Sequence, residues 1–150
     1  SFARGAYQQA NLEANGIHLA PAICFEIAFP RQVAANLYAN TDMIITVSND
    51  AWFGRSHGPA QHLEIARMRA LEFGRPVLRA TNNGISAFID AKGQITARLP
   101  QFEAGSLTAP VTATEGLTPY RQLGDLPMGI LLTLLLIVSI TSKKHRRLFS

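Results

Sequence analysis

Cysteine is scarce in this sequence, whose 150 residues contain only Cys24. A disulfide within the chain is therefore excluded, because that bond needs two cysteines. Lysine is also rare: apart from the basic residues near the C-terminus, the only one is Lys92. Charged residues make up 16% of the chain and hydrophobic residues 47%, which is apolar for a soluble domain, and the apolar excess lies at the C-terminal end.

Net charge is nearly absent from most of the chain. The formal charge of +4 comes from 14 basic and 10 acidic residues. Four of the basic residues lie together near the C-terminus: Lys143, Lys144, Arg146 and Arg147. Without them the chain is neutral, whereas a nucleic-acid surface needs basic residues spread over a folded face. We therefore expect no nucleic-acid partner.

The chain also lacks an initiator methionine and the features of a signal peptide. A length of 150 residues indicates one domain at most, or part of one. The first strong strand signal nevertheless begins as early as Ile17. We therefore expect this chain to be the C-terminal part of a longer protein.

Cys24 follows an apolar stretch, Ile17–Ile23, that is typical of a buried strand, and precedes a helix expected from Pro30 to about Ala39. In α/β folds the sharp turn between a strand and a helix can expose a nucleophile. The backbone N–H of the next residue, here Phe25, can then stabilise an oxyanion. Cys24 is therefore a candidate nucleophile. The alternative is a buried structural thiol, because free cysteines are among the most buried residues.

The other patterns predict an α/β fold. A second apolar strand at Met43–Ser48 completes a βαβ unit. A long helix from Pro59 to Gly74 then leads into a third strand at Arg75–Thr81. Tight-turn residues predict an antiparallel meander after it. Its strands are expected at Ile85–Ile89, Gln94–Leu99 and Ser106–Thr112.

The loop after the second strand is a candidate for substrate contact, because open α/β sheets place their sites at the carboxyl ends of strands. It begins at Asn49 and contains the only tryptophan, Trp52, next to Phe53. These three residues are candidates for contacting a substrate. The equally weighted alternative is a loop fixed by the packing of its aromatic side chains.

The run from Leu126 to Thr141 contains no charged residue. Its roughly 16 residues would form a helix about 24 Å long, which is short for a hydrocarbon core of about 30 Å. The absence of a polar face and the basic residues that follow nevertheless predict a transmembrane helix over residues 123–142. Residues 143–150 would form a basic cytoplasmic tail, with the α/β part on the opposite side. A helix of the protein core is the alternative.

Four blocks of sequence, in their order and spacing, carry a resemblance to a known family: Ala20–Glu26, Val47–Gly54, Ala66–Glu72 and Ala80–Gly84. With them the chain resembles the nitrilase superfamily of carbon–nitrogen hydrolases. The segment Gly116–Tyr120, ahead of a last hydrophobic helix, resembles the membrane-bound acyltransferase branch of that superfamily more than the soluble nitrilases. The resemblance implies that residues 1–122 form the C-terminal part of a nitrilase-like αββα sandwich.

The resemblance also implies site residues. The family uses a Glu-Lys-Cys triad, in which Cys24 matches the nucleophile, while the Glu and Lys belong upstream of it and have no counterpart in this chain. Glu26 matches a supporting carboxylate, and Phe25 stands where many members have Tyr, so that only its backbone N–H can serve. The family needs no cofactor or metal. The four histidines show no ligand spacing, and we expect them to be solvated or packed: His18, His57, His62 and His145.

The implied reaction is a two-step acyl transfer in the bacterial inner membrane, with the catalytic domain in the periplasm. A membrane phospholipid would donate an acyl chain to Cys24 as a thioester. The N-terminal amine of an apolipoprotein, on a diacylglyceryl-cysteine, would then accept it. Two alternatives remain open: a membrane-anchored amidase with water as the acceptor, and a non-enzymatic domain whose cysteine lies in the core.

Overall fold

The computed structural model describes the backbone of residues 5–148 and the side chains of residues 5–142. The side chains of the basic tail lie outside the described residues. The chain forms two compact units, one that ends at Thr118 and one that begins at Pro119. Each is described by itself.

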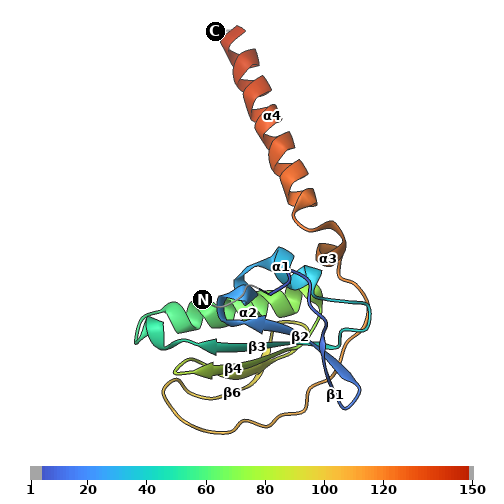
Figure 1. Cartoon of the computed structure of the whole chain (residues 1–150). Helices are drawn as coiled ribbons and strands as arrows, with labels where there is room; N and C mark the ends of the chain where they lie inside the picture. The colour runs from blue at the N-terminus through green and yellow to red at the C-terminus, as the bar shows by residue number, and fades with distance from the viewer. Residues whose placement is uncertain (1–4, 149–150) are drawn as a thin grey trace. The chain divides into compact units, whose positions relative to one another are not determined.

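The first unit is built on one mixed sheet of six strands, which lie in the sheet in the same order as in the sequence. Its centre is parallel: β2 pairs with β3 and β3 with β4, whereas β1, β5 and β6 are attached antiparallel at the two sides. This confirms the predicted α/β fold and the change from βαβ units to an antiparallel meander (Figure 1). The strands are β1 (Leu12–Ala14), β2 (Ile17–Ile23), β3 (Met43–Asn49), β4 (Val77–Asn82), β5 (Ala87–Ile89) and β6 (Ile95–Arg98).

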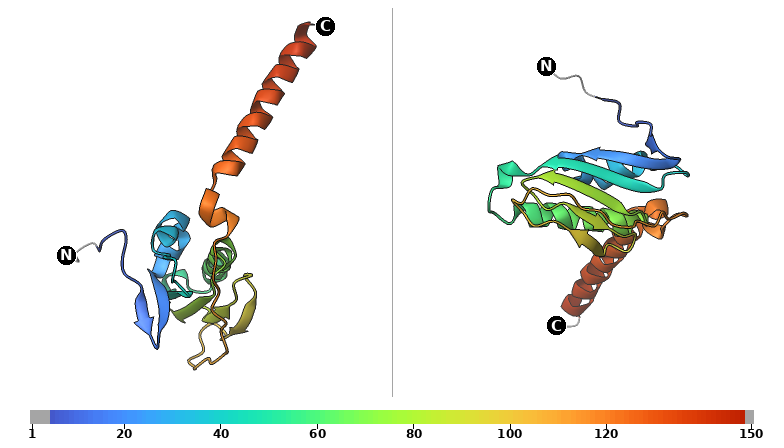
Figure 2. Two further views of the ribbon diagram at one scale, coloured as in Figure 1. Left: turned by 90° about the vertical axis from the view of Figure 1, so that its right-hand side faces the viewer. Right: turned by 90° about the horizontal axis from the view of Figure 1, so that it is seen from below.

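Helices lie on one face of this sheet. The two α-helices of the unit, α1 (Pro30–Ala35) and α2 (Gly58–Phe73), lie on the same side of the strands (Figure 2, left). Two 3-10 helices, η1 (Cys24–Ala28) and η2 (Ala51–Phe53), follow β2 and β3 directly. Alternate strand residues on one face of the sheet are buried and form much of the core: Ala20, Ala22, Ile44, Thr46, Val77, Arg79, Ala87 and Ile89.

The opposite face of the sheet is apolar but much less covered. Seen from that side, the strands lie in front of α1 and α2 (Figure 2, right). Ile23 is 56% exposed and Val47 is 42% exposed. Ile45 and Leu78 on this face are half-buried. Exposed β-branched side chains on a central strand indicate a surface that another layer can cover.

One predicted strand is wrong. Within the described residues, Ser106–Thr112 pairs with no other strand. The alternation that predicted it is real, because Leu107, Ala109 and Val111 are half-buried and the residues between them are exposed. Pro110 cannot donate to a ladder, however. The alternation of apolar and polar residues in this segment therefore indicates an extended chain that packs one side inward without pairing with a strand.

The predicted helix after Pro30 is shorter than expected, because α1 ends at Ala35 and Asn36 takes the position after it. The side-chain amide of Asn36 donates to the carbonyl oxygens of Gln32 and Tyr7. An Asn side chain that bonds the backbone in this way competes with continuation of the helix. The end of α2 agrees with the prediction, since Gly74 has a φ of 60° and its N–H bonds the carbonyl of Ala70.

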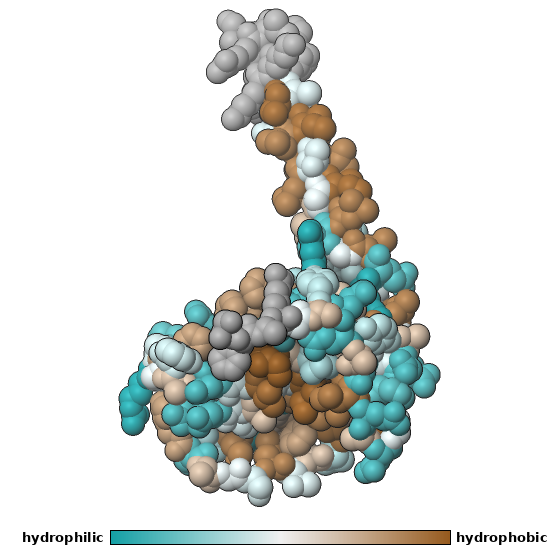
Figure 3. Space-filling view, viewed as in Figure 1, coloured by the Kyte–Doolittle hydropathy of each residue, from teal (hydrophilic) through white to brown (hydrophobic). Residues whose placement is uncertain are grey.

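The second unit contains a short helix, α3 (Pro119–Leu123), and a long one, α4 (Leu126–Leu148). The apolar side chains of α4 are exposed along its described length, which is seen as brown surface in Figure 3. The hydroxyl of Thr133 donates to the carbonyl of Gly129, and that of Thr141 donates to the carbonyl of Ile137. Within the described residues, no helix reaches the combination of length and apolar character that crossing a membrane requires.

Candidate active site

Cys24 lies directly after β2 and begins η1, at the turn where the sequence placed a nucleophile. Its φ is +53°, a left-handed conformation that non-glycine residues rarely adopt. Such backbone strain persists only where the surrounding structure enforces it, and it concentrates at functional sites. The thiol is half-buried and reduced. A strained turn at the carboxyl end of a parallel strand is the backbone geometry in which α/β enzymes present a nucleophile, so Cys24 remains the candidate.

Glu26 stabilises the same turn. Its Oε2 accepts a hydrogen bond of 2.7 Å from the backbone N–H of Ile23, the residue before Cys24. A carboxylate acceptor makes this bond charge-assisted and therefore strong. Within the described side chains, Glu26 forms no ion pair with an arginine. Its contact is therefore with the backbone of the turn.

Phe25 is the second residue of η1, so its backbone N–H lies in the first turn, where such groups have no carbonyl partner within the helix. Its side chain is 51% exposed. The ring lies edge-on against Phe29, with centroids 5.8 Å apart, and tilted against His62 at 6.0 Å. Cys24 is therefore bordered by an exposed aromatic surface.

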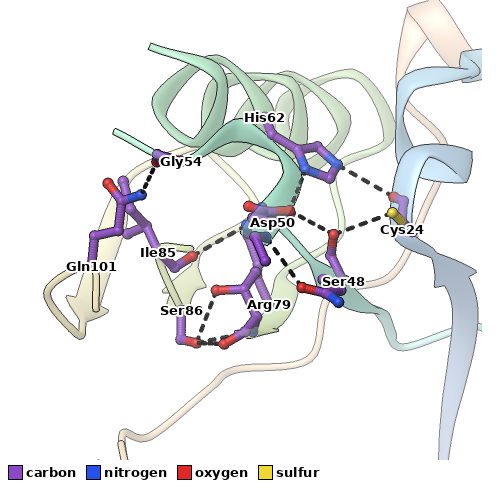
Figure 4. A network of polar contacts seen from close by, with 12 residues as sticks. Cys24, Ser48, Asp50, Gly54, His62, Arg79, Ile85, Ser86 and Gln101 are labelled. Carbon is purple, nitrogen blue, oxygen red and sulfur yellow. Dashed lines mark hydrogen bonds and ion pairs between the residues drawn. The ribbon is translucent and has the colours of Figure 1, made fainter. Parts of the chain in front are cut away.

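A buried polar cluster lies behind Cys24 (Figure 4). Its centre is Asp50, which follows β3 and whose side chain is fully buried. Oδ2 of Asp50 accepts a 2.6 Å hydrogen bond from Nη2 of Arg79. Oδ1 of Asp50 accepts a 2.6 Å hydrogen bond from Oγ of Ser48 and lies 3.0 Å from Nδ1 of His62. Ser48 Oγ is in turn 3.4 Å from the sulfur of Cys24. Three elements thus meet at one carboxylate: β3, β4 and α2. Ser48 and His62 connect this cluster to Cys24 of η1.

The cluster places one buried negative and one buried positive charge near Cys24. Burial lowers the pKa of the Arg79 guanidinium, although Asp50 and, to a lesser degree, Cys24 raise it again. Asp50 and Arg79 therefore form a mutually neutralising pair in an environment where either charge alone would be costly. The loop around Gly84 packs against Asp50 so closely that a Cβ on Gly84 would clash with the Asp50 side chain.

His62 is the residue that sequence reasoning missed. We expected the histidines to be solvated or packed, but the His62 side chain is 2% exposed and bonded on both sides of its ring. Nδ1 faces Asp50, and Nε2 lies 3.3 Å from the carbonyl oxygen of Cys24. The signal that could have found it is its place early in α2, directly after a loop at the carboxyl edge of the sheet.

The loop candidates have different environments. Oδ1 of Asn49 accepts from the N–H of Ala51 at 3.1 Å, so this side chain shapes the start of the loop. Phe53 packs on Gly58, where a Cβ would clash with the ring, and lies edge-on to His62 at 6.2 Å. Trp52 is 88% exposed, so it does not fix the loop by packing within the first unit.

Lys92 does not belong to this site. It lies in the turn between β5 and β6, and the pairing of Ile89 with Val77 puts that turn at the amino end of β4. Cys24 lies beyond the carboxyl end of β2, which is parallel to β4 through β3. Among the side chains described, no three His, Cys, Asp or Glu residues lie close enough together to hold a metal ion.

Known proteins resemble the chain in sequence. Residues 4–120 match the carbon-nitrogen hydrolase family. A relative named apolipoprotein N-acyltransferase from Vibrio parahaemolyticus is 54% identical over 139 residues, and one from Shewanella oneidensis is 52% identical over 147 residues. These alignments cover 93% and 98% of this chain but 28% of each relative. The chain therefore spans little more than a quarter of the length of these relatives.

Solved structures resemble it in fold. An amidase of the nitrilase superfamily from Nesterenkonia has a TM-score of 0.57 and 21% sequence identity, over 70% of this chain and 42% of that chain. A carbon-nitrogen hydrolase from Helicobacter pylori has a TM-score of 0.59 and 14% identity, over 69% of this chain and 43% of that chain. The first unit therefore has a nitrilase-like α/β fold with a mixed sheet.

Proposed function

Because the chain belongs to the carbon-nitrogen hydrolase family, we propose that it carries the nucleophile of a lipoprotein N-acyltransferase. In this proposal, an acyl chain passes from a membrane phospholipid to Cys24 and then to the N-terminal amine of a diacylglyceryl-cysteine apolipoprotein. The observation that carries it is a cysteine with a φ of +53° after a parallel strand, in a chain about half identical to relatives named apolipoprotein N-acyltransferase.

The first step is attack of the Cys24 thiolate on the ester carbonyl of the phospholipid. The carbon–sulfur bond forms and the ester carbon–oxygen bond breaks, so that a thioester and a protonated lysophospholipid result. In the second step the amine attacks the thioester, an amide forms, and the thiol is regenerated. An unactivated thiol is only a few per cent ionised at pH 7, and the family's Glu and Lys would supply the base and a cation.

The tetrahedral intermediates of both steps need hydrogen-bond donors. The backbone N–H of Phe25 is our candidate, since it lies in the first turn of η1 next to the nucleophile. Glu26 would hold this turn through Ile23. The exposed rings of Phe25 and Phe29 would border the acyl chain, and Asn49, Trp52 and Phe53 would shape the loop facing the substrate.

We further propose that the sheet is one half of an αββα sandwich. The apolar open face, with Ile23 and Val47 exposed, is the surface that a second sheet would cover. The second half would contribute the Glu and Lys of the triad. This agrees with a chain that spans 28% of the two relatives compared above.

We also propose that α4 contacts the bilayer of the bacterial inner membrane. Its described apolar side chains are exposed, and Thr133 and Thr141 bond their hydroxyls to carbonyls within the helix, which lowers the cost of placing them in lipid. The uncharged run is about 24 Å long against a hydrocarbon core of about 30 Å. Local thinning of the bilayer and snorkelling of the tail lysines would compensate for the difference.

The competing function is hydrolysis of a carbon–nitrogen bond, as in the amidases that share the fold. A reconstituted assay separates the two. The full-length protein is mixed with a phospholipid labelled in its acyl chain and with a diacylglyceryl lipopeptide. We expect labelled lipopeptide and lysophospholipid, and no label on the lipopeptide with Cys24→Ala. Release of free acid or of ammonia, without labelled lipopeptide, would favour the hydrolase.

A further inference from the structure

Ser48 stands between the nucleophile and the buried carboxylate. Its hydroxyl oxygen is 3.4 Å from the sulfur of Cys24 and 2.6 Å from Oδ1 of Asp50 (Figure 4). A hydroxyl has one proton to donate and can also accept. Ser48 can therefore donate to only one of these two neighbours at a time.

The ionisation state of Cys24 decides which neighbour receives the Ser48 proton. Arg79 donates to Asp50 at 2.6 Å and both side chains are fully buried, so Asp50 is held as a carboxylate that only accepts. When Cys24 is a thiol, Ser48 donates to Asp50 and its oxygen accepts from the S–H. When the thiol ionises, the Ser48 hydroxyl turns and donates to the sulfur instead.

Asp50 can release the Ser48 proton because its other partners remain. Oδ2 keeps Arg79, and Oδ1 keeps His62 at 3.0 Å. His62 also holds the nucleophile from the other side, since Nε2 lies 3.3 Å from the carbonyl oxygen of Cys24.

We propose that Ser48 is a catalytic hydrogen-bond donor to the Cys24 thiolate. Asp50 accepts the Ser48 proton while Cys24 is a thiol, and it can release that proton because Arg79 and His62 remain as its partners. The proposal rests on Cys24 being the nucleophile of the proposed function. It adds a stabilising group from the described chain itself, beneath the nucleophile. The step is a rotation of one hydroxyl, and the thiol proton leaves to the base of the triad.

The charged and titratable groups around Cys24 in the described chain come from four elements. They are Glu26 of η1, Asp50 after β3, His62 of α2 and Arg79 of β4. The substitution Ser48→Ala changes none of these four groups. The Ser48→Ala variant therefore removes the donor without altering a charge, and its effect on the thiolate can be assigned to the hydroxyl.

The test measures the alkylation rate of Cys24 by iodoacetamide across pH in the full-length protein, followed on the Cys24 peptide by mass spectrometry. For Ser48→Ala we expect the midpoint of the profile to rise by about one pH unit, the change that loss of one bond to a charged group produces. The rate at the high-pH plateau should rise roughly threefold, because a less stabilised thiolate is a better nucleophile. A role in packing alone would not produce a higher midpoint together with a faster plateau rate.

The matched control is Ser86→Ala. The Ser86 hydroxyl bonds the backbone N–H of Thr81 at 3.0 Å and so stabilises a neighbouring loop without contacting Cys24 or Asp50. Its profile should match that of the unchanged protein. An unshifted midpoint in Ser48→Ala, with thermal unfolding unchanged, would overturn the proposal. This readout needs no acyl donor, so it stands apart from the assay of the proposed function.

Discussion

Glu26 is positioned to stabilise the backbone of the turn that contains Cys24, since its carboxylate accepts a hydrogen bond from the N–H of Ile23 at 2.7 Å. Gln at this position keeps an acceptor oxygen but loses the charge. Charge-assisted hydrogen bonds are about twice as strong as neutral ones. Glu26→Gln should therefore lower kcat/KM by roughly ten-fold, which is about 1.4 kcal/mol of barrier. Glu26→Ala removes the acceptor entirely and should lower it further.

Steady-state acyl transfer in the full-length protein measures this ranking. If Gln and Ala are equally inactive, the carboxylate acts through its charge on another group, such as the family's lysine, and not through the turn. If Gln retains full activity, the charge is not needed at all.

At single residues, the sequence predicted what local chain order determines. Cys24 and Phe25 are consecutive, and the strand before them identified the turn, whereas the candidate role of Glu26 came from the family resemblance. The cluster of Ser48, Asp50, His62 and Arg79 could not be found in this way. Its members come from three elements that meet only when α2 packs on the sheet, so no spacing in the sequence records their contact.

Two loops at the carboxyl edge of the sheet are joined by a close approach. Gly84, in the turn after β4, lies against Asp50, where a Cβ would clash with that side chain. Gly84→Ala should therefore lower the free energy of unfolding by about 1–3 kcal/mol, as overpacking of a filled interior does. It should also lower activity by displacing Asp50.

Chemical denaturation and activity of the full-length protein are the measurements for Gly84→Ala. Gly105→Ala is the control, because the nearest atom to its added methyl group would be a side-chain carbon of Leu99 at 3.4 Å. Equal stability of the two variants would mean that the loop around Gly84 can move away from Asp50 at no cost.

At the level of elements, apolar patterns predicted the parallel strands well because these strands carry apolar residues on both faces, which gives a long apolar run. They failed at Ser106–Thr112, which alternates in burial yet forms no ladder. Side-chain periodicity reports which residues pack inward. Strand pairing depends in addition on backbone donors and on a free sheet edge, and Pro110 removes one donor.

For the whole molecule, the proposed membrane span makes a topological prediction. Accessibility reporters are placed after Ser150 and at Lys92, in the exposed turn between β5 and β6. A third is placed at Gly105 as a control, since it lies in the same unit as Lys92. In the full-length protein we expect the Lys92 and Gly105 reporters in the periplasm and the Ser150 reporter in the cytoplasm.

Finding all three reporters on one side would remove the membrane span, and α4 would then be a helix of the core or of an interface. Finding Lys92 and Gly105 on different sides would contradict the first unit as one folded body. The first of these outcomes would not alter the geometry around Cys24.

The central claim is that Cys24 carries the acyl group. The full-length protein is incubated with phospholipid and no acceptor, quenched in acid, and digested for mass spectrometry. We predict the mass of one acyl chain on the peptide that contains Cys24, removed by neutral hydroxylamine as a thioester is, and absent in Cys24→Ala. An acyl group on another residue, or transfer by Cys24→Ala at a comparable rate, would contradict the account.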